Sequence, residues 1–192
     1  MRRTFPLLIA SCFVALVVVV GWGSSVGAWS TGAGGDPNWG STTFGGTNSD
    51  RAYGVAVDGA GNVYTTGAFF GTVNFGAGNV TAAGAPDVFV TKLNSSGAHQ
   101  WTTTLGSDGA ATYSRQVAVD GSGNVHVAGY FEGTVDFGAG DVASAGDYDA
   151  FVTKLNSSGA HQWTTTFGGT HFDGDQGESV AVDGSGNVHV GG

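Results

Sequence analysis

The fold is decided by a stretch that occurs twice: residues 87–106 read DVFVTKLNSSGAHQWTTTLG, and residues 149–168 read DAFVTKLNSSGAHQWTTTFG. The two copies are identical at 18 of 20 positions and lie 62 residues apart. A second motif, VAVDGSGNVHV, occurs at 117–127 and again at 180–190, with the variant VAVDGAGNVYT at 55–65. A fixed period predicts tandem copies of one supersecondary unit, each burying its apolar face against its neighbours.

The composition around these repeats favours strands. The 192 residues include 36 Gly but only 3 Pro, and 11% are charged. Many Gly, Thr, Val and Ala with few Lys, Glu and Leu disfavour helix and suit short strands joined by tight turns. The hydrophobic content of 41% is sufficient for a packed core.

Each unit is predicted to contain four main strands. In the first unit these are 53–58, 62–69, 87–94 and 98–105, with Gly-containing turns between the first two and the last two. The Gly-rich stretches GTVNFGAG (71–78) and GTVDFGAG (133–140) are expected to be surface excursions that hold a short edge strand. Short turns between sequential strands predict an antiparallel meander. Tandem four-stranded meanders predict an all-β fold of β-propeller type, with a stacked solenoid as the alternative.

The number of repeats predicts an incomplete propeller. The repeats cover residues 39–192: an outer strand at 39–44, unit 1 at 53–105, unit 2 at 115–167 and a partial unit 3 at 178–192. This is about two and three-quarter blades, whereas propellers typically close with four to eight. We expect the neighbouring blades to belong to a longer reading frame or to be supplied by oligomerisation.

The N-terminus has the pattern of a secretory signal peptide at residues 1–28. Arg2 and Arg3 precede an apolar run at 5–20, and a small-residue segment ends at Ala28, the expected cleavage site. A retained anchor and a lipoprotein signal modified at Cys12 are the alternatives. A Gly-rich linker at 29–38 follows the signal. The predicted location is secreted, extracellular or at the cell surface.

The charge of the remaining chain excludes two classes of partner. After Ala28 there are four basic residues against 15 acidic ones, a net charge of −11, and no cysteine. Such an acidic surface repels nucleic acid and anionic lipid. We therefore expect no nucleic acid partner and no membrane contact after signal cleavage.

Several elements together resemble a known bacterial repeat. VAVDGSGNVHVAG (117–129), GTVDFG (133–138), DAFVTKLNSSG (149–159) and the following Trp163 resemble the SBBP repeat, named for a seven-bladed beta-propeller. The resemblance covers about residues 39–192. It implies a secreted or surface protein with many tandem copies, and it implies no single activity.

Two sets of acidic residues are candidates for calcium. Asp173, Asp175 and Glu178 form the one dense acidic loop and are a weak Ca²⁺ candidate, with a solvated loop as the alternative, because the full EF-hand pattern is missing. A second set precedes Gly-x-Gly-Asn in each unit: Asp58, Asp120 and Asp183. For these a hairpin turn is predicted, because Asp and Asn side chains bond their own backbone.

Other polar and aromatic residues recur at the repeat period, which favours packing roles. The histidines are His99, His126, His161 and His189, with His171 outside the pattern, and they lack the spacing of a zinc site. Trp101 and Trp163 are predicted to lie in the core between blades, although they could instead stack on sugars. Lys92 and Lys154 are expected to reach the surface or to pair with an acid of a neighbouring blade.

These patterns predict a binding protein. There is no GxSxG motif, no cysteine after the signal, and no Ser–His–Asp set outside the repeats. We expect a non-catalytic scaffold that needs no cofactor and presents loops to a protein or glycan at the cell surface. The alternative is a fragment of a propeller enzyme, a lyase or hydrolase, whose catalytic blade is absent from this chain.

Overall fold

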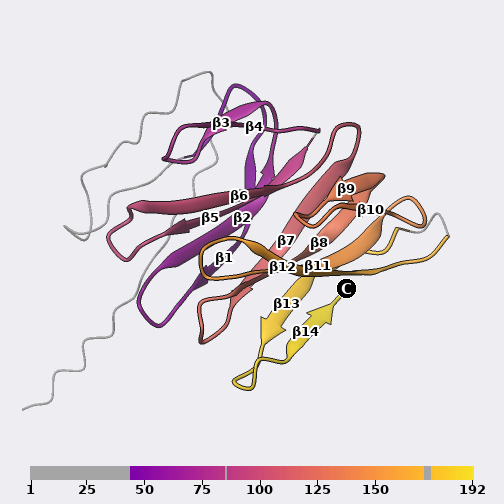
Figure 1. Cartoon of the computed structure of the whole chain (residues 1–192). Coiled ribbons are helices and arrows are strands. Elements are labelled where there is room, and N and C mark those ends of the chain that lie inside the picture. Colours follow the sequence, from indigo (N-terminus) through magenta and orange to yellow (C-terminus); the bar gives the residue numbers. More distant parts are fainter. Residues whose placement is uncertain (1–43, 85, 171–173) are drawn as a thin grey trace, which may run out of the picture.

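The structure is a computed structural model that describes residues 44–84, 86–170 and 174–192 (Figure 1). Every regular element in these ranges is a β-strand, so the predicted all-β class is confirmed. The described ranges contain no helix with the length and apolar content to cross a bilayer. The predicted signal peptide (1–28) and linker (29–38) lie outside the described residues. Of the predicted outer strand at 39–44 only Phe44 is described, and it belongs to no strand.

The predicted four-stranded meanders are confirmed as two antiparallel sheets, which we call blade 1 and blade 2. Blade 1 has the order β1-β2-β5-β6, and blade 2 has the equivalent order β7-β8-β11-β12. A two-stranded sheet, β13-β14, follows. The bounds are β1 (Arg51–Val57), β2 (Val63–Phe69), β5 (Asp87–Leu93), β6 (His99–Leu105), β7 (Ala111–Val119), β8 (Val125–Glu132), β11 (Asp149–Leu155), β12 (His161–Phe167), β13 (Ser179–Val182) and β14 (Val188–Gly191).

The Gly-rich excursions are hairpins rather than single edge strands. β3 (Thr72–Asn74) pairs with β4 (Asn79–Thr81), and β9 (Thr134–Asp136) pairs with β10 (Asp141–Ala143). In each hairpin the last residue of the first strand, Asn74 or Asp136, accepts backbone hydrogen bonds through Oδ1 from the two glycines of the turn. The side chain of this residue therefore stabilises the turn that joins the two strands. The sequence predicted one strand in each excursion and missed the second, β4 or β10.

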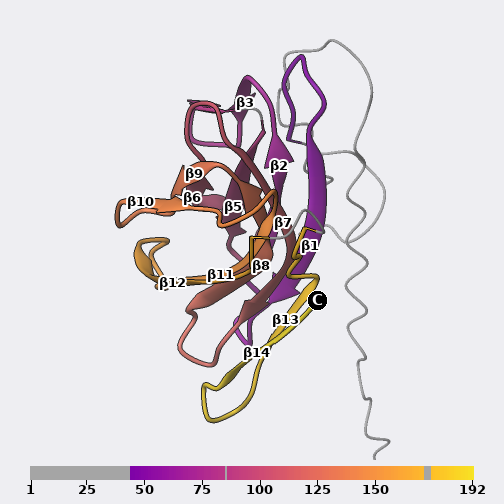
Figure 2. The same ribbon diagram turned by 90° about the vertical axis from the view of Figure 1, so that its right-hand side faces the viewer.

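The sheets stack face to face in sequence order (Figures 1 and 2). β7 contacts β1 and β2 on one side and β13 on the other, so the first strands of successive units are neighbours. This is the arrangement of propeller blades around an axis, and the described sheets form an open arc without closure.

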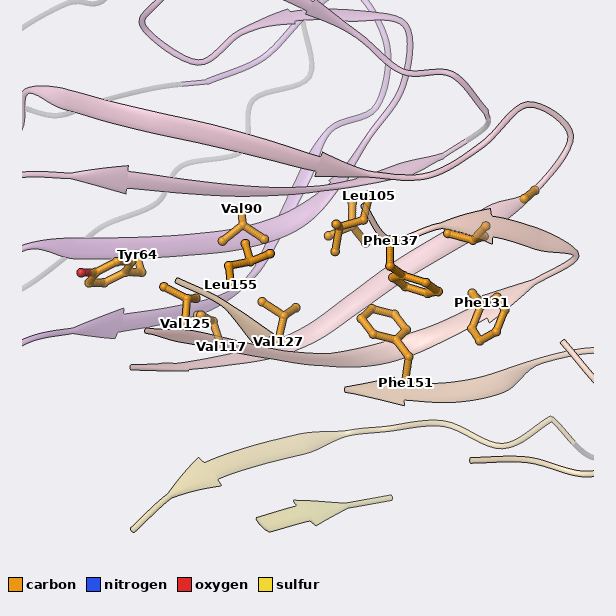
Figure 3. Close-up of a cluster of buried hydrophobic side chains, with 13 residues drawn as sticks. Tyr64, Val90, Leu105, Val117, Val125, Val127, Phe131, Phe137, Phe151 and Leu155 are labelled. Atoms are coloured by element: carbon orange, nitrogen blue, oxygen red, sulfur yellow. The ribbon is translucent and has the colours of Figure 1, made fainter. Parts of the chain in front are cut away.

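The main core lies between blade 1 and blade 2 (Figure 3). Tyr64, Val90 and Leu105 of blade 1 face Val127 and Phe151 of blade 2, all fully or almost fully buried. A second cluster, Ala128, Val152 and Val180, joins blade 2 to β13. Each blade therefore buries its apolar side chains against the next blade, as the repeat predicts.

A β-bulge interrupts the first strand of each four-stranded blade. The register shifts between Ala52 and Gly54 in β1 and between Ser114 and Gln116 in β7, which leaves Tyr53 and Arg115 as the extra residues.

Glycine lies opposite each bulge for a steric reason. Gly67 pairs with Ala52, and Gly129 pairs with Ser114. A Cβ at Gly129 would collide with the Tyr113 carbonyl and would lie 2.8 Å from Ser114 Cα. The absence of a side chain at Gly129 therefore leaves room for the bulged backbone of β7.

Replacing Gly129 by alanine should consequently destabilise the chain by about 1–3 kcal/mol, the usual cost of overpacking. Chemical denaturation would measure the free energy of unfolding. The matched control is Gly121→Ala, because a Cβ at Gly121 would meet no atom within 4 Å. Equal stabilities for the two variants would contradict the steric role of Gly129.

Candidate functional site

The two bulges bring together residues that differ between otherwise near-identical repeats. Tyr53, Arg115 and Glu178 occupy the same repeat position, since Asp58, Asp120 and Asp183 each follow five residues later. A bulge redirects the side chain of its extra residue, and bulges are frequent beside functional sites. A bulge in the backbone of blades 1 and 2 thus coincides with a position at which the repeats differ.

Arg115 joins its counterparts from the neighbouring sheets. Its guanidinium lies over the Tyr53 ring, with Cζ 5.8 Å from the ring centroid. On the other side its Nε lies 3.5 Å from Glu178 Oε1, an ion pair between partly exposed groups. The guanidinium also lies over the Tyr130 ring at 5.0 Å, and its Nη2 donates to Gln176 Oε1 at 3.3 Å. One cation thus links blade 1, blade 2 and the segment before β13.

Tyrosines surround this cation. Tyr130 stacks on Tyr113 with ring centroids 5.0 Å apart and packs edge-to-face against Tyr148 at 5.3 Å. Burial raises the pKa of the Tyr130 hydroxyl, although the Arg115 charge opposes the shift. Burial and the neighbouring Glu132 raise the pKa of Tyr148. These hydroxyls are therefore neutral at physiological pH and can donate hydrogen bonds.

We call this set the tyrosine–arginine cluster. It contains four of the five tyrosines of the chain, and its members are Tyr53, Tyr113, Arg115, Tyr130, Glu132, Tyr148, Gln176 and Glu178. Tyr53 is 37% exposed, and Tyr113, Tyr130 and Tyr148 are half-buried. The cluster therefore presents ring faces and hydroxyls at the surface.

A hollow of about 520 Å³ adjoins the cluster at Glu132. Its lining combines small residues with two exposed carboxylates: Ala83, Gly84, Asp108, Gly109, Ala110, Ala111, Glu132 and Gly133. The small side chains leave backbone groups accessible beside the carboxylates. Together the hollow and the cluster offer aromatic faces, hydrogen-bond donors and hydrogen-bond acceptors, the kinds of group that line ligand-binding sites.

The structure does not gather the acidic loop into a group. Asp173 lies outside the described residues. Asp175 Oδ2 accepts a hydrogen bond from the Gly169 amide at 3.2 Å, whereas Glu178 pairs with Arg115. No group of three or more His, Cys, Asp or Glu in the described ranges is arranged to hold a metal. The calcium site at Asp173, Asp175 and Glu178 stays a prediction.

The turn interpretation of the second acidic set is confirmed. Asp120 Oδ1 accepts from the amides of Ser122 and Asn124, and Oδ2 accepts from Asn124 Nδ2 at 2.8 Å. Asp58 and Asp183 make the same three contacts in their own turns. Burial raises the pKa of Asp120, but these hydrogen bonds outweigh it and lower the pKa overall.

Of the two alternatives expected for the lysines, pairing with an acid of a neighbouring blade is wrong for Lys154, whose side chain is partly exposed. Lys154 Nζ lies 3.9 Å from Asp120 Oδ2, so its acidic partner belongs to the same blade and not to a neighbour. The reason is register: Lys154 pairs with His126 across β11 and β8, and both lie beside the Asp120 turn. Lys92, the equivalent in blade 1, lies 5.1 Å from the Tyr64 ring centroid.

The histidines divide into two groups. His99 and His161 make the same contact in each blade, from Nε2 to the hydroxyl of Thr102 or Thr164 at 2.9 Å, as their recurrence predicts. His126 is 1% exposed, whereas the His189 side chain is 67% exposed, so these two do not share one packing role. His171 lies outside the described residues.

Two buried carboxylates were not singled out from the sequence as structural residues. Asp87 accepts from the amides of Ala83 and Gly84, and Asp149 accepts from the amide of Ala145 at 2.8 Å. Burial raises the pKa of Asp87. Each acid fixes the loop that returns from the hairpin, and an acidic residue at the start of an otherwise apolar strand was the available signal.

The comparison with known families agrees with this architecture. Residues 100–130 match the SBBP family model, described as a beta-propeller repeat. Residues 100–130 are thus similar to an SBBP beta-propeller repeat. The matched segment runs from β6 through β7 to Tyr130 in β8, so this SBBP segment includes the bulge at Arg115. No curated protein matches the chain.

The burial of His126 makes the stability of the folded chain depend on pH. Its burial, together with the Lys154 charge, lowers its pKa below the ordinary value of 6.5, although Asp120 opposes the shift. The unfolded chain therefore binds more protons as the pH falls through about 6.5, and stability decreases from there toward the lower pKa of the folded state.

His126→Tyr should reduce this loss of stability between pH 7 and 5. Tyr64 occupies the same place in blade 1 and donates to Asp58 Oδ2 at 3.0 Å, so a tyrosine at 126 has a ready acceptor in Asp120. Urea denaturation at several pH values would measure the free energy of unfolding. The control is His189→Tyr, at the exposed equivalent position. If the free energy of unfolding changed with pH in His126→Tyr as it does in the wild type, His126 would not be the source of the pH dependence.

Proposed function

We propose that this chain is a secreted, non-catalytic β-propeller repeat protein that serves as a binding scaffold at the cell surface. The single observation that supports this most is the tyrosine–arginine cluster. In a chain whose repeats are otherwise near copies, it is the place where equivalent positions hold Tyr53, Arg115 and Glu178.

The side chains of the cluster suit a ligand that is both flat and polar. Tyrosine supplies a large amphipathic surface at low cost in side-chain entropy, and arginine and tyrosine are enriched among residues that dominate binding energy. Glu132, Gln176 and Glu178 add acceptors, and Gln176 also has an amide donor. A glycan fits this combination best, because sugar rings have apolar faces and hydroxyl edges. A protein loop is the second class of ligand that we consider.

The net charge of the chain restricts the class of glycan that we propose as the ligand. At a formal net charge of −9, the protein repels strongly anionic ligands, and the single cation of the cluster is already paired with Glu178. A neutral or weakly charged glycan is therefore favoured over an acidic polysaccharide.

Binding to a glycan array should depend on Tyr53 and Tyr148. Tyr53→Ala and Tyr148→Ala each remove a ring without opening the core between the blades, and each should weaken binding about tenfold, the effect of losing about 1.4 kcal/mol. Affinities would be measured by calorimetry on the glycan selected from the array.

Tyr64→Phe is the matched control, because it removes a hydroxyl from the one tyrosine outside the cluster. Undiminished affinity in both alanine variants would contradict the assignment of the site. Cleavage of a bound glycan would instead favour a propeller lyase or hydrolase.

A further inference from the structure

Arg115 meets a different partner on each side. Its guanidinium lies over the Tyr53 ring of blade 1, with Cζ 5.8 Å from the ring centroid, and its Nε lies 3.5 Å from Glu178 Oε1. Because these three residues hold one position in successive units, that position supplies an aromatic ring, a cation and an anion in turn. The residue that the next unit supplies therefore decides whether the charge of Arg115 is compensated.

The guanidinium of Arg115 keeps donors that its neighbours do not use. Nη2 donates to the Tyr130 hydroxyl at 3.4 Å and to Gln176 Oε1 at 3.3 Å. Nε is shielded from solvent and makes no hydrogen bond within the described residues. In the same ranges Nη1 makes none either, and the Arg115 side chain is 31% exposed. The two N–H groups of Nη1 are thus available to a ligand, and a guanidinium is suited to binding a carboxylate.

Backbone contacts hold Glu178 beside Arg115. The preceding residue, Gly177, donates its amide to the Gly129 carbonyl at 3.1 Å, and Gly129 lies opposite the bulge. A Cβ at Gly177 would lie 2.9 Å from that carbonyl oxygen, so this close approach of two backbones requires glycine. The Glu178 amide donates to the Gly191 carbonyl at 2.8 Å. The place of Glu178 is therefore fixed by the backbone and does not depend on the charge of its side chain.

The ion pair between Arg115 and Glu178 matters more for a ligand than for folding. The two side chains are 31% and 52% exposed, and pairs that face water contribute little to stability. A ligand carboxylate at the same guanidinium, however, would come close to the Glu178 carboxylate. Like charges brought together at a binding surface reject the wrong partner. Glu178 therefore opposes an anionic ligand at Arg115.

We propose that Glu178 is the residue that makes the tyrosine–arginine cluster select neutral glycans over carboxylated ones. The inference rests on the proposed glycan binding, and it names the sugars that the site excludes, namely uronic acids and other sugars with a carboxylate. Without the charge of Glu178, Arg115 can bind such a carboxylate through Nη1. The residue that one unit holds at this position thus sets the charge of the ligand that the preceding unit accepts.

Pairs of array glycans that differ by one terminal uronic acid in place of the neutral sugar test this selection. Glu178→Gln removes the charge but keeps the size of the side chain. By calorimetry it should bind the carboxylated member about tenfold more tightly than the wild type does, because the guanidinium is then uncompensated. Normal binding of the neutral member without this gain would overturn the proposal and leave the proposed function standing.

Asp141→Asn is the matched control for net charge. It removes one negative charge, as Glu178→Gln does, but from β10, outside the cluster. Blade 1 has Asn79 at the equivalent position, so asparagine is compatible with this hairpin. The variant should bind the carboxylated member as weakly as the wild type does. A gain equal to that of Glu178→Gln would overturn the proposal, because the overall charge would then account for it.

Two further variants locate the gain at Arg115. Glu178→Tyr copies the residue that unit 1 holds at this position, Tyr53, and it should also gain affinity for the carboxylated member. The double variant Arg115→Gln/Glu178→Gln should lose the gain, and a gain that persists without Arg115 would overturn the proposal. If the wild type and both Glu178 variants bind no glycan of either kind, the proposed function fails together with this inference.

Discussion

Two hydrogen bonds from Trp101 and Thr103 to the backbone of the 156–160 turn fix how one blade sits on the next. They set the distance and the angle at which the apolar faces meet, and the cluster around Val90, Val127 and Phe151 fills the space between them. Because the acceptors are backbone carbonyls, the contact tolerates sequence change in the turn except at Gly159, where a Cβ would lie 2.8 Å from the Trp101 ring. The turn at 156–160 has its copy at 94–98, and the donors Trp101 and Thr103 have theirs at Trp163 and Thr165.

The same packing leaves the position of Tyr53, Arg115 and Glu178 free to vary. At the bulge the backbone leaves the regular ladder, and Gly67 and Gly129 provide the space for it. Side chains at the two bulges touch the neighbouring sheet without belonging to its core, so Tyr53 and Arg115, and Glu178 at the equivalent position before β13, can differ while the blades remain alike. A binding surface built on such positions can change its specificity at little cost to stability, which suits a repeat scaffold.

Much of the fold could be predicted from residues 87–106 and their copy, because strand periodicity and turn residues are local properties. The Asp120 turn was predictable for the same reason. The tyrosine–arginine cluster was not, since its members come from two sheets and from the segments before β11 and β13, and no spacing along the sequence brings Tyr53, Arg115 and Tyr148 together. The partner of Lys154 was predicted wrongly because it depends on the register of β8 and β11, which the sequence pattern leaves undetermined.

The turn at 156–160, docked on Trp101 and Thr103, couples the two blades. A double-mutant cycle between Trp101→Phe and Gly159→Asn, followed by urea denaturation, measures that coupling directly. We predict an interaction energy of about 1–2 kcal/mol, within the range for residues in contact. The same cycle with Gly97→Asn in place of Gly159→Asn should give additive effects. Additivity in the first cycle would contradict the claim.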